Sequence, residues 1–317
     1  MKVALLYHGR LPVERYGGTP RVVVWLARGL AQLGHEVVLL AAPGSRVPEA
    51  RLVPVDPRET ESIRFDVRPH LPPGTDVLHA HRPLEPAGVP TLWTLHGTAT
   101  RADYPPNMVC LSADHARRSG ATAFVHNGLD PAEFRFNADK EPFDLFLGRL
   151  HSAKGWRWAV EGASRAGRRL VVAGGWRPVF RRGVRVVGQV GGNRKRDLLA
   201  RASCLWMPAL WDEPFGLTLI EAMASGTPVL GTRRGALPEI VTAETGALGD
   251  TLDELVSLRA ALGNIDPAAC RAHVEARFTH RNMAEGYLAL YREMIEKGEL
   301  RQRSTVNSQR DLPRAPQ

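Results

Sequence analysis

The stretch "EPFGLTLIEAMASGTPVL", residues 213–230, reads as a loop, a helix and the start of a buried strand. Apolar side chains recur at helical spacing from Leu217, and a second apolar run follows a glycine and a proline. This order is typical of a strand–helix–strand unit and predicts an α/β fold. Two carboxylates, Glu213 and Glu221, lie inside the apolar unit and require an explanation.

The same alternation of short apolar runs and helical patterns extends in both directions. Strand-like runs in the first half include "KVALLYH", "HEVVLLA", "DVLHAH" and "TLWTLH", and those in the second include "FDLFLGRL", "RRLVVAGG" and "CLWMPAL". Such alternation implies parallel strands joined by right-handed crossovers. The sequence therefore predicts two Rossmann-like domains facing across a cleft, at residues 1–130 and 143–280, joined by a linker at 131–142. Residues 300–317 lack apolar periodicity and predict a flexible tail.

Charge and composition narrow the classes of partner. The formal net charge of +9 permits nucleic acid, an anionic small substrate, or a peripheral contact with the inner membrane face. The densest basic zone, residues 177–196, lacks interleaved aromatics and nucleic-acid signatures, so we interpret it as a solvated face and expect no nucleic-acid partner. Three cysteines at no metal-like spacing, and no apolar run of roughly 20 residues, predict a cytoplasmic protein.

Two post-strand loops carry groups suited to an anion. Gly17 and Gly18 follow the first strand and allow close backbone approach at a helix N-terminus, which attracts phosphate. Arg149 and Lys154 flank a turn after a buried strand and suit a diphosphate gripped without metal. Each feature alone is also compatible with an ordinary turn or with solvated surface cations.

The opening stretch adds hydroxyl-binding groups to such an anion site. Glu221 falls early in the helix that begins near Leu217, and Glu213 lies in the preceding loop. Backbone N–H groups of residues 215–217 (Phe215, Gly216 and Leu217) can bind phosphate oxygens, while carboxylates accept hydrogen bonds from sugar hydroxyls. The combination fits a sugar nucleotide, with Glu221 on the ribose and Glu213 on the transferred sugar. The alternative is a capping glutamate with a buried ion pair.

Three histidines, His79, His81 and His96, each fall near the end of a predicted strand, where we expect them to face the cleft. No carboxylate or cysteine cluster accompanies them, so we predict no metal site. The chain also lacks G-x-G-x-x-G after the first strand of either half and lacks a Walker loop, which argues against dehydrogenases and phosphate-loop NTPases.

At this point the chain resembles glycosyltransferase family 4, retaining enzymes with the two-domain GT-B fold, within glycosyl transferases group 1. The segment "EPFGLTLIEAMASGTPVLGTRRGALPEIV" matches that family's E-x7-E signature, and the quoted glycine loop, histidine strands, "VHNGLD" and "LGRLHSAKG" agree in order and spacing. The resemblance covers residues 1 to about 295.

The resemblance implies a retaining transfer of a hexose-type sugar from a nucleoside-diphosphate sugar to an unidentified hydroxyl acceptor, without metal or other cofactor. Glu213 would contact the donor sugar, Glu221 the ribose, and Arg149 and Lys154 the diphosphate leaving group. His96 would contact the sugar, and Gly17 and Gly18 the donor phosphate or the reacting region. The last helix, residues 281–299, would cross back to the amino-terminal domain.

Two departures leave alternatives open. Pro20 stands where the family often has glutamate, and only nine residues separate His81 from the next predicted strand, too few for the usual crossover helix. A noncatalytic sugar-nucleotide-binding subunit, a GT-B epimerase and a phosphorylase therefore remain as alternatives. Phosphorylases of this architecture carry a lysine for pyridoxal phosphate, and nothing in the sequence marks such a lysine. The donor base, the sugar, the acceptor and the oligomeric state are not readable from the sequence.

Overall fold

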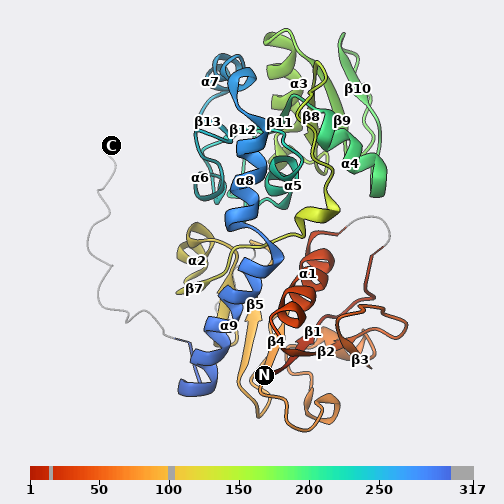
Figure 1. The fold of residues 1–317 in the computed structure, drawn as a ribbon, viewed down its shortest axis with the longest axis vertical. Helices are drawn as coiled ribbons and strands as arrows, with labels where there is room; N and C mark the ends of the chain where they lie inside the picture. Colours follow the sequence, from red (N-terminus) through yellow and green to blue (C-terminus); the bar gives the residue numbers. More distant parts are fainter. Residues whose placement is uncertain (14–16, 99–103, 301–317) are drawn as a thin grey trace, which may run out of the picture.

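A computed structural model describes residues 1–13, 17–98 and 104–300 and contains two parallel sheets stacked end to end along the long axis (Figure 1). Every strand pair is parallel, as the alternating sequence pattern predicts. The expectation of two Rossmann-like sheets facing across a cleft is confirmed. The predicted tail at 300–317 lies outside the described residues, apart from Leu300.

The amino-terminal sheet has seven strands in the order β3-β2-β1-β4-β5-β6-β7. Strand β1 pairs with β2 on one side and with β4 on the other, so the strand order reverses beside β1. Ligands of open α/β sheets bind at such a reversal, outside the carboxyl ends of the strands. The strands are β1 Lys2–Leu6, β2 Glu36–Ala41, β3 Arg51–Pro54, β4 Val77–Ala80, β5 Thr91–Thr94, β6 Met108–Cys110 and β7 Ala123–Phe124.

The carboxy-terminal sheet repeats this plan with six strands in the order β10-β9-β8-β11-β12-β13. Its order reverses between β8 and β11, which are neighbours in the sheet although two strands separate them in sequence. The strands are β8 Phe143–Leu147, β9 Arg169–Ala173, β10 Val184–Val186, β11 Cys204–Met207, β12 Val229–Thr232 and β13 Gly246–Gly249.

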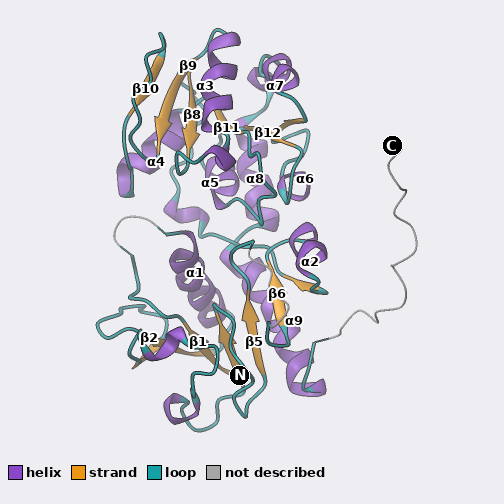
Figure 2. Cartoon of the chain, turned by 180° about the vertical axis from the view of Figure 1, so that it is seen from behind, coloured by secondary structure: helices purple, strands orange, loops and turns teal. Residues whose placement is uncertain are grey.

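Helices cover both sheets (Figure 2). Helix α1 buries Val22, Trp25, Leu26 and Leu30, whose spacing places them on one face against the amino-terminal core. The helices are α1 Gly18–Gln32, α2 Ala113–Ser119, α3 Trp156–Arg165, α4 Gly192–Arg201, α5 Leu217–Ala224, α6 Leu237–Ile240, α7 Leu252–Leu258, α8 Pro267–Arg277 and α9 His280–Lys297.

The last two helices belong to different domains by packing. Helix α8 packs on α5, whereas α9 packs along α1 and reaches β4 (Figure 1). Gly29 permits the close crossing of α1 and α9, because a Cβ there would lie 2.4 Å from the His280 carbonyl oxygen. Tyr287 and Tyr291 of α9 are fully buried in the amino-terminal domain. The break between these helices falls at Phe278 and Thr279, where Thr279 caps α9.

Several local expectations differ from the structure. Residues 251–262, "TLDELVSLRAAL", have the sequence pattern of a single helix, but the α-helix ends at Leu258 and a 3-10 turn, Ala261–Asn264, follows. Helices α2 and α6 are short and carry too little periodicity to be predicted from sequence. No α-helix lies between β4 and β5, where the nine-residue connection was too short for one. Among the described residues, no helix is long and apolar enough to span a bilayer.

Candidate active site

A cavity of about 500 Å³ lies between the two domains, at the carboxyl ends of both sheets. Its walls come from the segments that follow β1, β8 and β11, the strands at which the two sheet orders reverse. Gly17 and Gly18 contribute from the amino-terminal side, and residues 213–218 from the carboxy-terminal side. A Cβ on Gly18 would lie 3.2 Å from Leu217 Cδ1, so the glycine loop faces the tip of α5 across the cleft. The fold thus brings the predicted site segments together.

Arg149 and Lys154 both line this cavity. Arg149 lies two residues after the end of β8 and is exposed, with no ion-pair partner among the described residues. Lys154 ends the 3-10 turn Ser152–Lys154, and its side chain is only 18% exposed. The alternative of two solvated surface cations is therefore wrong for Lys154, because its Nζ lies 2.5 Å from Glu213 Oε2 and 4.4 Å from the centre of the Trp211 ring.

The turn that presents Lys154 requires glycine at its end. Gly155 has φ +69°, a left-handed conformation, and a Cβ there would lie 1.7 Å from the Pro208 carbonyl oxygen. Lys154 N also donates to the His151 carbonyl. The turn is thereby held against the loop that follows β11 and leads to Glu213.

The Glu213 carboxylate is held from two sides. Its Oε2 accepts hydrogen bonds from Lys154 Nζ at 2.5 Å and from the Trp211 indole Nε1 at 2.9 Å. The residue is buried within the loop that precedes α5. Glu213 therefore presents a fixed, charge-balanced carboxylate to the cavity.

Glu221 is 1% exposed and lies between two cations from different domains. Its Oε1 accepts a hydrogen bond from Arg21 Nη1 on α1, and its Oε2 lies 2.6 Å from Lys195 Nζ on α4. Burial raises the pKa of the Glu221 carboxyl, but the Lys195 and Arg21 charges outweigh burial and hold the pKa below its usual value. The buried ion pair that sequence analysis kept as an alternative is present, and it lies in the cavity wall.

The tip of α5 is shaped by Gly216, whose φ of +89° is left-handed. Phe215 is buried, with ring centroids 5.8 Å from His126 and 6.0 Å from Phe278. Phe215, Gly216 and Leu217 all line the cavity. The first amide groups of a helix have no acceptor within it, so this tip offers N–H donors to an anion.

The histidines divide into two kinds. His96 lines the cavity, and burial together with the nearby His115 lowers its pKa to about 3, so it is neutral at pH 7. His81 and His79 do not line the cavity, which corrects the expectation that all three face the cleft. His79 is in the core, with Nδ1 at 2.7 Å from the Tyr291 hydroxyl and Nε2 at 2.7 Å from Thr94 Oγ1. His81 Nδ1 lies 3.0 Å from His96 Nε2 and orients that ring.

Sequence reasoning missed several cavity residues, among them Arg21, Lys195 and Trp211. Lys195 lies in the basic zone interpreted as a solvated face, yet its side chain is only 16% exposed. Arg21 lies one helical turn after Gly17 and Gly18. A cation so close to a proposed anion site was a signal that could have identified it from the sequence. Trp211 stands two residues before Glu213, and its contacts with Lys154 and with the Glu213 carboxylate mark its importance.

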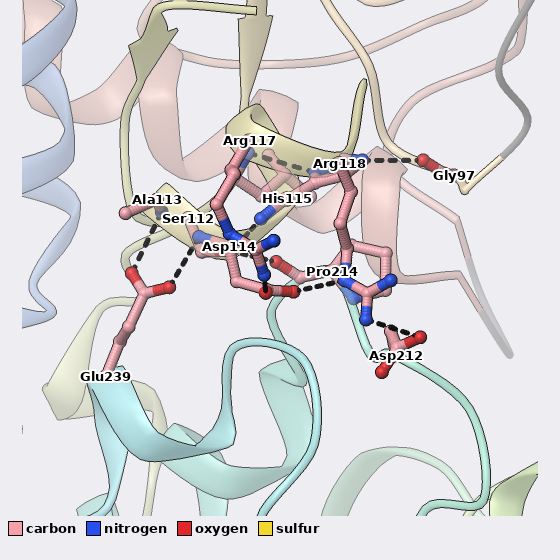
Figure 3. Close-up of polar contacts among 11 residues, drawn as sticks. Gly97, Ser112, Ala113, Asp114, His115, Arg117, Arg118, Asp212, Pro214 and Glu239 are labelled. Atoms are coloured by element: carbon pink, nitrogen blue, oxygen red, sulfur yellow. Dashed lines mark hydrogen bonds and ion pairs between the residues drawn. The ribbon is translucent and has the colours of Figure 1, made fainter. Parts of the chain in front are cut away.

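A second contact between the domains lies beside the Glu213 loop (Figure 3). Ser112 Oγ donates to the Pro214 carbonyl at 2.9 Å, and the Ala113 and Asp114 amides donate to the Glu239 carboxylate at 2.9 and 2.8 Å. Arg118 Nη2 lies 2.5 Å from Asp212 Oδ2. These bonds join α2 of one domain to α6 and the Glu213 loop of the other, and so fix the width of the cleft.

Comparisons with known proteins give the class. The family model for glycosyl transferases group 1 matches residues 141–263. The crystal structure of AviGT4, a glycosyltransferase involved in avilamycin A biosynthesis, superposes with a TM-score of 0.78 at 31% identity, covering 93% of this chain and 98% of that one. Phosphatidyl-myo-inositol mannosyltransferase of Propionibacterium freudenreichii subsp. shermanii is 26% identical over 75% of this chain and 79% of its own length.

HepE of Anabaena, solved in complex with UDP-glucose, shares the fold with a TM-score of 0.65 at 14% identity, covering 92% of this chain and 100% of that one. For other curated relatives the chain spans about two fifths of their length, 39% and 42% in two cases.

The two facing sheets and these likenesses define a glycosyltransferase of the GT-B class. The chain belongs to the glycosyl transferases group 1 family.

Proposed function

We propose that this glycosyltransferase is a retaining enzyme of family 4 that transfers a hexose-type sugar from a nucleoside-diphosphate sugar to a hydroxyl acceptor, without a metal ion. One observation carries the proposal: Arg149, Lys154, Glu213 and Glu221 line a single cavity at the carboxyl ends of both sheets. The cations suit a diphosphate, and the carboxylates suit hydroxyl groups on either side of it.

In this proposal the donor spans the carboxy-terminal wall. The diphosphate lies against Arg149, Lys154 and the amide groups at the tip of α5. The ribose hydroxyls reach Glu221, and the transferred sugar lies near Glu213 and His96. Gly17 and Gly18 leave room for the phosphate from the opposite side. Among the described residues, no group of three or more acidic, histidine or cysteine side chains could hold a metal ion.

The proposed reaction breaks the bond between the anomeric carbon and a diphosphate oxygen. The acceptor oxygen forms its bond to that carbon on the same face, and the acceptor proton passes to a donor phosphate oxygen. Negative charge develops on the departing diphosphate, so Arg149 and Lys154 stabilise the transition state more than the ground state. Because His96 is uncharged at pH 7, it forms a hydrogen bond with a sugar hydroxyl without adding positive charge.

The proposal is tested by thermal-shift screening with nucleoside diphosphates and their sugars, followed by assays of nucleoside diphosphate release. A ligand that binds only the native state raises the melting temperature. We expect one base to be favoured and the matching nucleotide sugar to release its diphosphate. Binding without release or transfer to any screened acceptor would favour the noncatalytic alternative, and release of a free epimer would favour the epimerase.

A further inference from the structure

The connection between β9 and β10, residues 174–183, carries two exposed aromatic side chains. Phe180 is 99% exposed and Trp176 is 73% exposed, the two largest exposures among the large hydrophobic side chains of the described chain. Other tryptophans, such as Trp25, Trp93 and Trp206, are buried in the cores. Side chains of this size are normally buried, and an exposed aromatic pair of this kind marks an interaction surface.

Exposed arginines lie close to these two aromatic residues in the sequence. Arg177, Arg181, Arg182 and Arg185 are all exposed, and the sequence has no aspartate or glutamate from residue 162 to residue 196. Arg181 is paired with Glu161, which lies on α3. Arg177, Arg182 and Arg185 have no ion-pair partner within the described residues. The surface therefore combines apolar rings with uncompensated positive charge.

The same connection begins at the wall of the active-site cavity. Gly174, which follows β9, lines the cavity, and its N–H donates to the Gly188 carbonyl at 2.8 Å. Gly175 forms an isolated bridge with Gly188, so the base of the connection is fixed. Strand β10 is the outer edge of its sheet, and the chain that leads to it runs along that edge (Figure 1). Trp176 is thus two residues from the cavity wall, on the outside of the molecule.

We propose that Trp176 and Phe180, together with Arg177, Arg182 and Arg185, form a docking surface for an anionic lipid bilayer. Tryptophan and phenylalanine partition into the headgroup region, where an aromatic body and a polar surrounding are both accommodated. Arginine beside them is attracted by the negative potential of anionic lipids, which acts within a Debye length of the surface. The surface begins beside the active-site cavity, because Trp176 is two residues after the lining residue Gly174.

Single-stranded nucleic acid is the other polyanion that binds aromatics and arginines. Base-stacking sites use aromatic platforms within a positively charged groove that follows the backbone. Here the two rings are on an outer edge, and neither Trp176 nor Phe180 lines a described cavity. The lipid surface is therefore the partner that the geometry favours.

Vesicle flotation with the full chain tests the proposal. We compare vesicles of phosphatidylcholine alone with vesicles of phosphatidylcholine and phosphatidylglycerol in equal parts. We expect binding to the anionic vesicles, weaker binding at high salt, and about tenfold or greater loss of binding for Trp176→Ser/Phe180→Ser and for Arg177→Gln/Arg182→Gln. These side chains are exposed, so the variants keep the melting temperature and the nucleotide-binding response of the wild type.

Matched variants on other faces serve as controls. Phe124→Ser/Phe136→Ser removes two half-exposed rings, and Arg58→Gln/Arg64→Gln removes two exposed arginines, both outside residues 174–185. We expect them to bind vesicles like the wild type. The proposal is overturned by absent vesicle binding, by equal losses in control and test variants, or by binding of a single-stranded oligonucleotide in place of vesicles.

Discussion

Arg21 donates a hydrogen bond to the Glu221 carboxylate, although the two residues are 200 positions apart in the sequence. Arg21 is on the first helix of one domain and Glu221 is on the helix of the other that carries the family signature. Lys195 binds the second oxygen of the same carboxylate at 2.6 Å. The carboxylate that we propose holds the ribose is thus also one of the groups that join the two domains.

The first prediction concerns the cations. Arg149→Ala should lower the rate of sugar transfer by about 100-fold or more, because one donor to the developing negative charge is lost. Its side chain is exposed, so the melting temperature should change little. Steady-state kinetics with the preferred nucleotide sugar provides the measurement, with Arg234→Ala, an exposed arginine outside the cavity, as the control. Equal rates for the two variants would contradict the proposed role.

The second prediction concerns Glu221. Glu221→Ala should weaken binding of the free nucleoside diphosphate and should also lower the free energy of unfolding by about 3–5 kcal/mol, because Lys195 and Arg21 lose their common partner. Glu221→Gln keeps the shape of the side chain and removes its charge. Comparing this variant with Glu221→Ala separates the effect of the charge from the effect of packing. Calorimetry measures the affinity and denaturant titration measures the stability. Unchanged affinity of Glu221→Ala for the nucleoside diphosphate would exclude the ribose contact. The ion pair that Glu221 forms in the wild type would then have a structural role.

The third prediction uses a pair of glycines with nearly equal φ angles. Gly155→Ala should be strongly destabilising and should reduce turnover, since its φ is +69° and the new methyl group would lie 1.7 Å from the Pro208 carbonyl. Gly167→Ala has φ +67° but meets nothing within 4 Å, so it should cost only the left-handed strain, about 1 kcal/mol. The difference in melting temperature between them isolates the steric term. Similar losses in both variants would show that the turn can move.

The fourth prediction concerns acidification. Burial lowers the pKa of His79, His81 and His96 below the usual value, for His96 to about 3. In the unfolded chain these rings bind protons near pH 6.5, so below that pH the unfolded state holds more protons than the folded state. Stability is complete above about pH 6.5 and falls below it, by at most about 1.4 kcal/mol per pH unit for each ring. Denaturant titrations between about pH 7 and pH 5 measure the slope, and a pH-independent free energy of unfolding would refute the assignment.

The two sheets and most helices were predictable because their signals are local. In the strand at residues 143–147 and the helix from Leu217, the apolar residues follow the spacing of the element. Residues that interrupt strands and helices stand at the ends. The linkage of Glu221 to Arg21 and Lys195 was not predictable, since it depends on how the domains are oriented and no local pattern encodes that. Lys154 was misjudged for a different reason: its partner Glu213 lies in the same domain but 59 residues away, and no local pattern pairs the two. His79 was misplaced because a strand end in sequence does not specify which side of the sheet a ring faces.

The final helix has a practical consequence for anyone dividing this enzyme into halves. Residues 1–130 alone would expose the faces of α1 and β4 that α9 covers, and would leave the buried His79 ring without the Tyr291 hydroxyl. A minimal amino-terminal fragment must therefore include residues 279–298, supplied in trans or by a permuted chain. Chimeras that exchange carboxy-terminal domains between homologues should keep this helix with the amino-terminal domain, against which it packs.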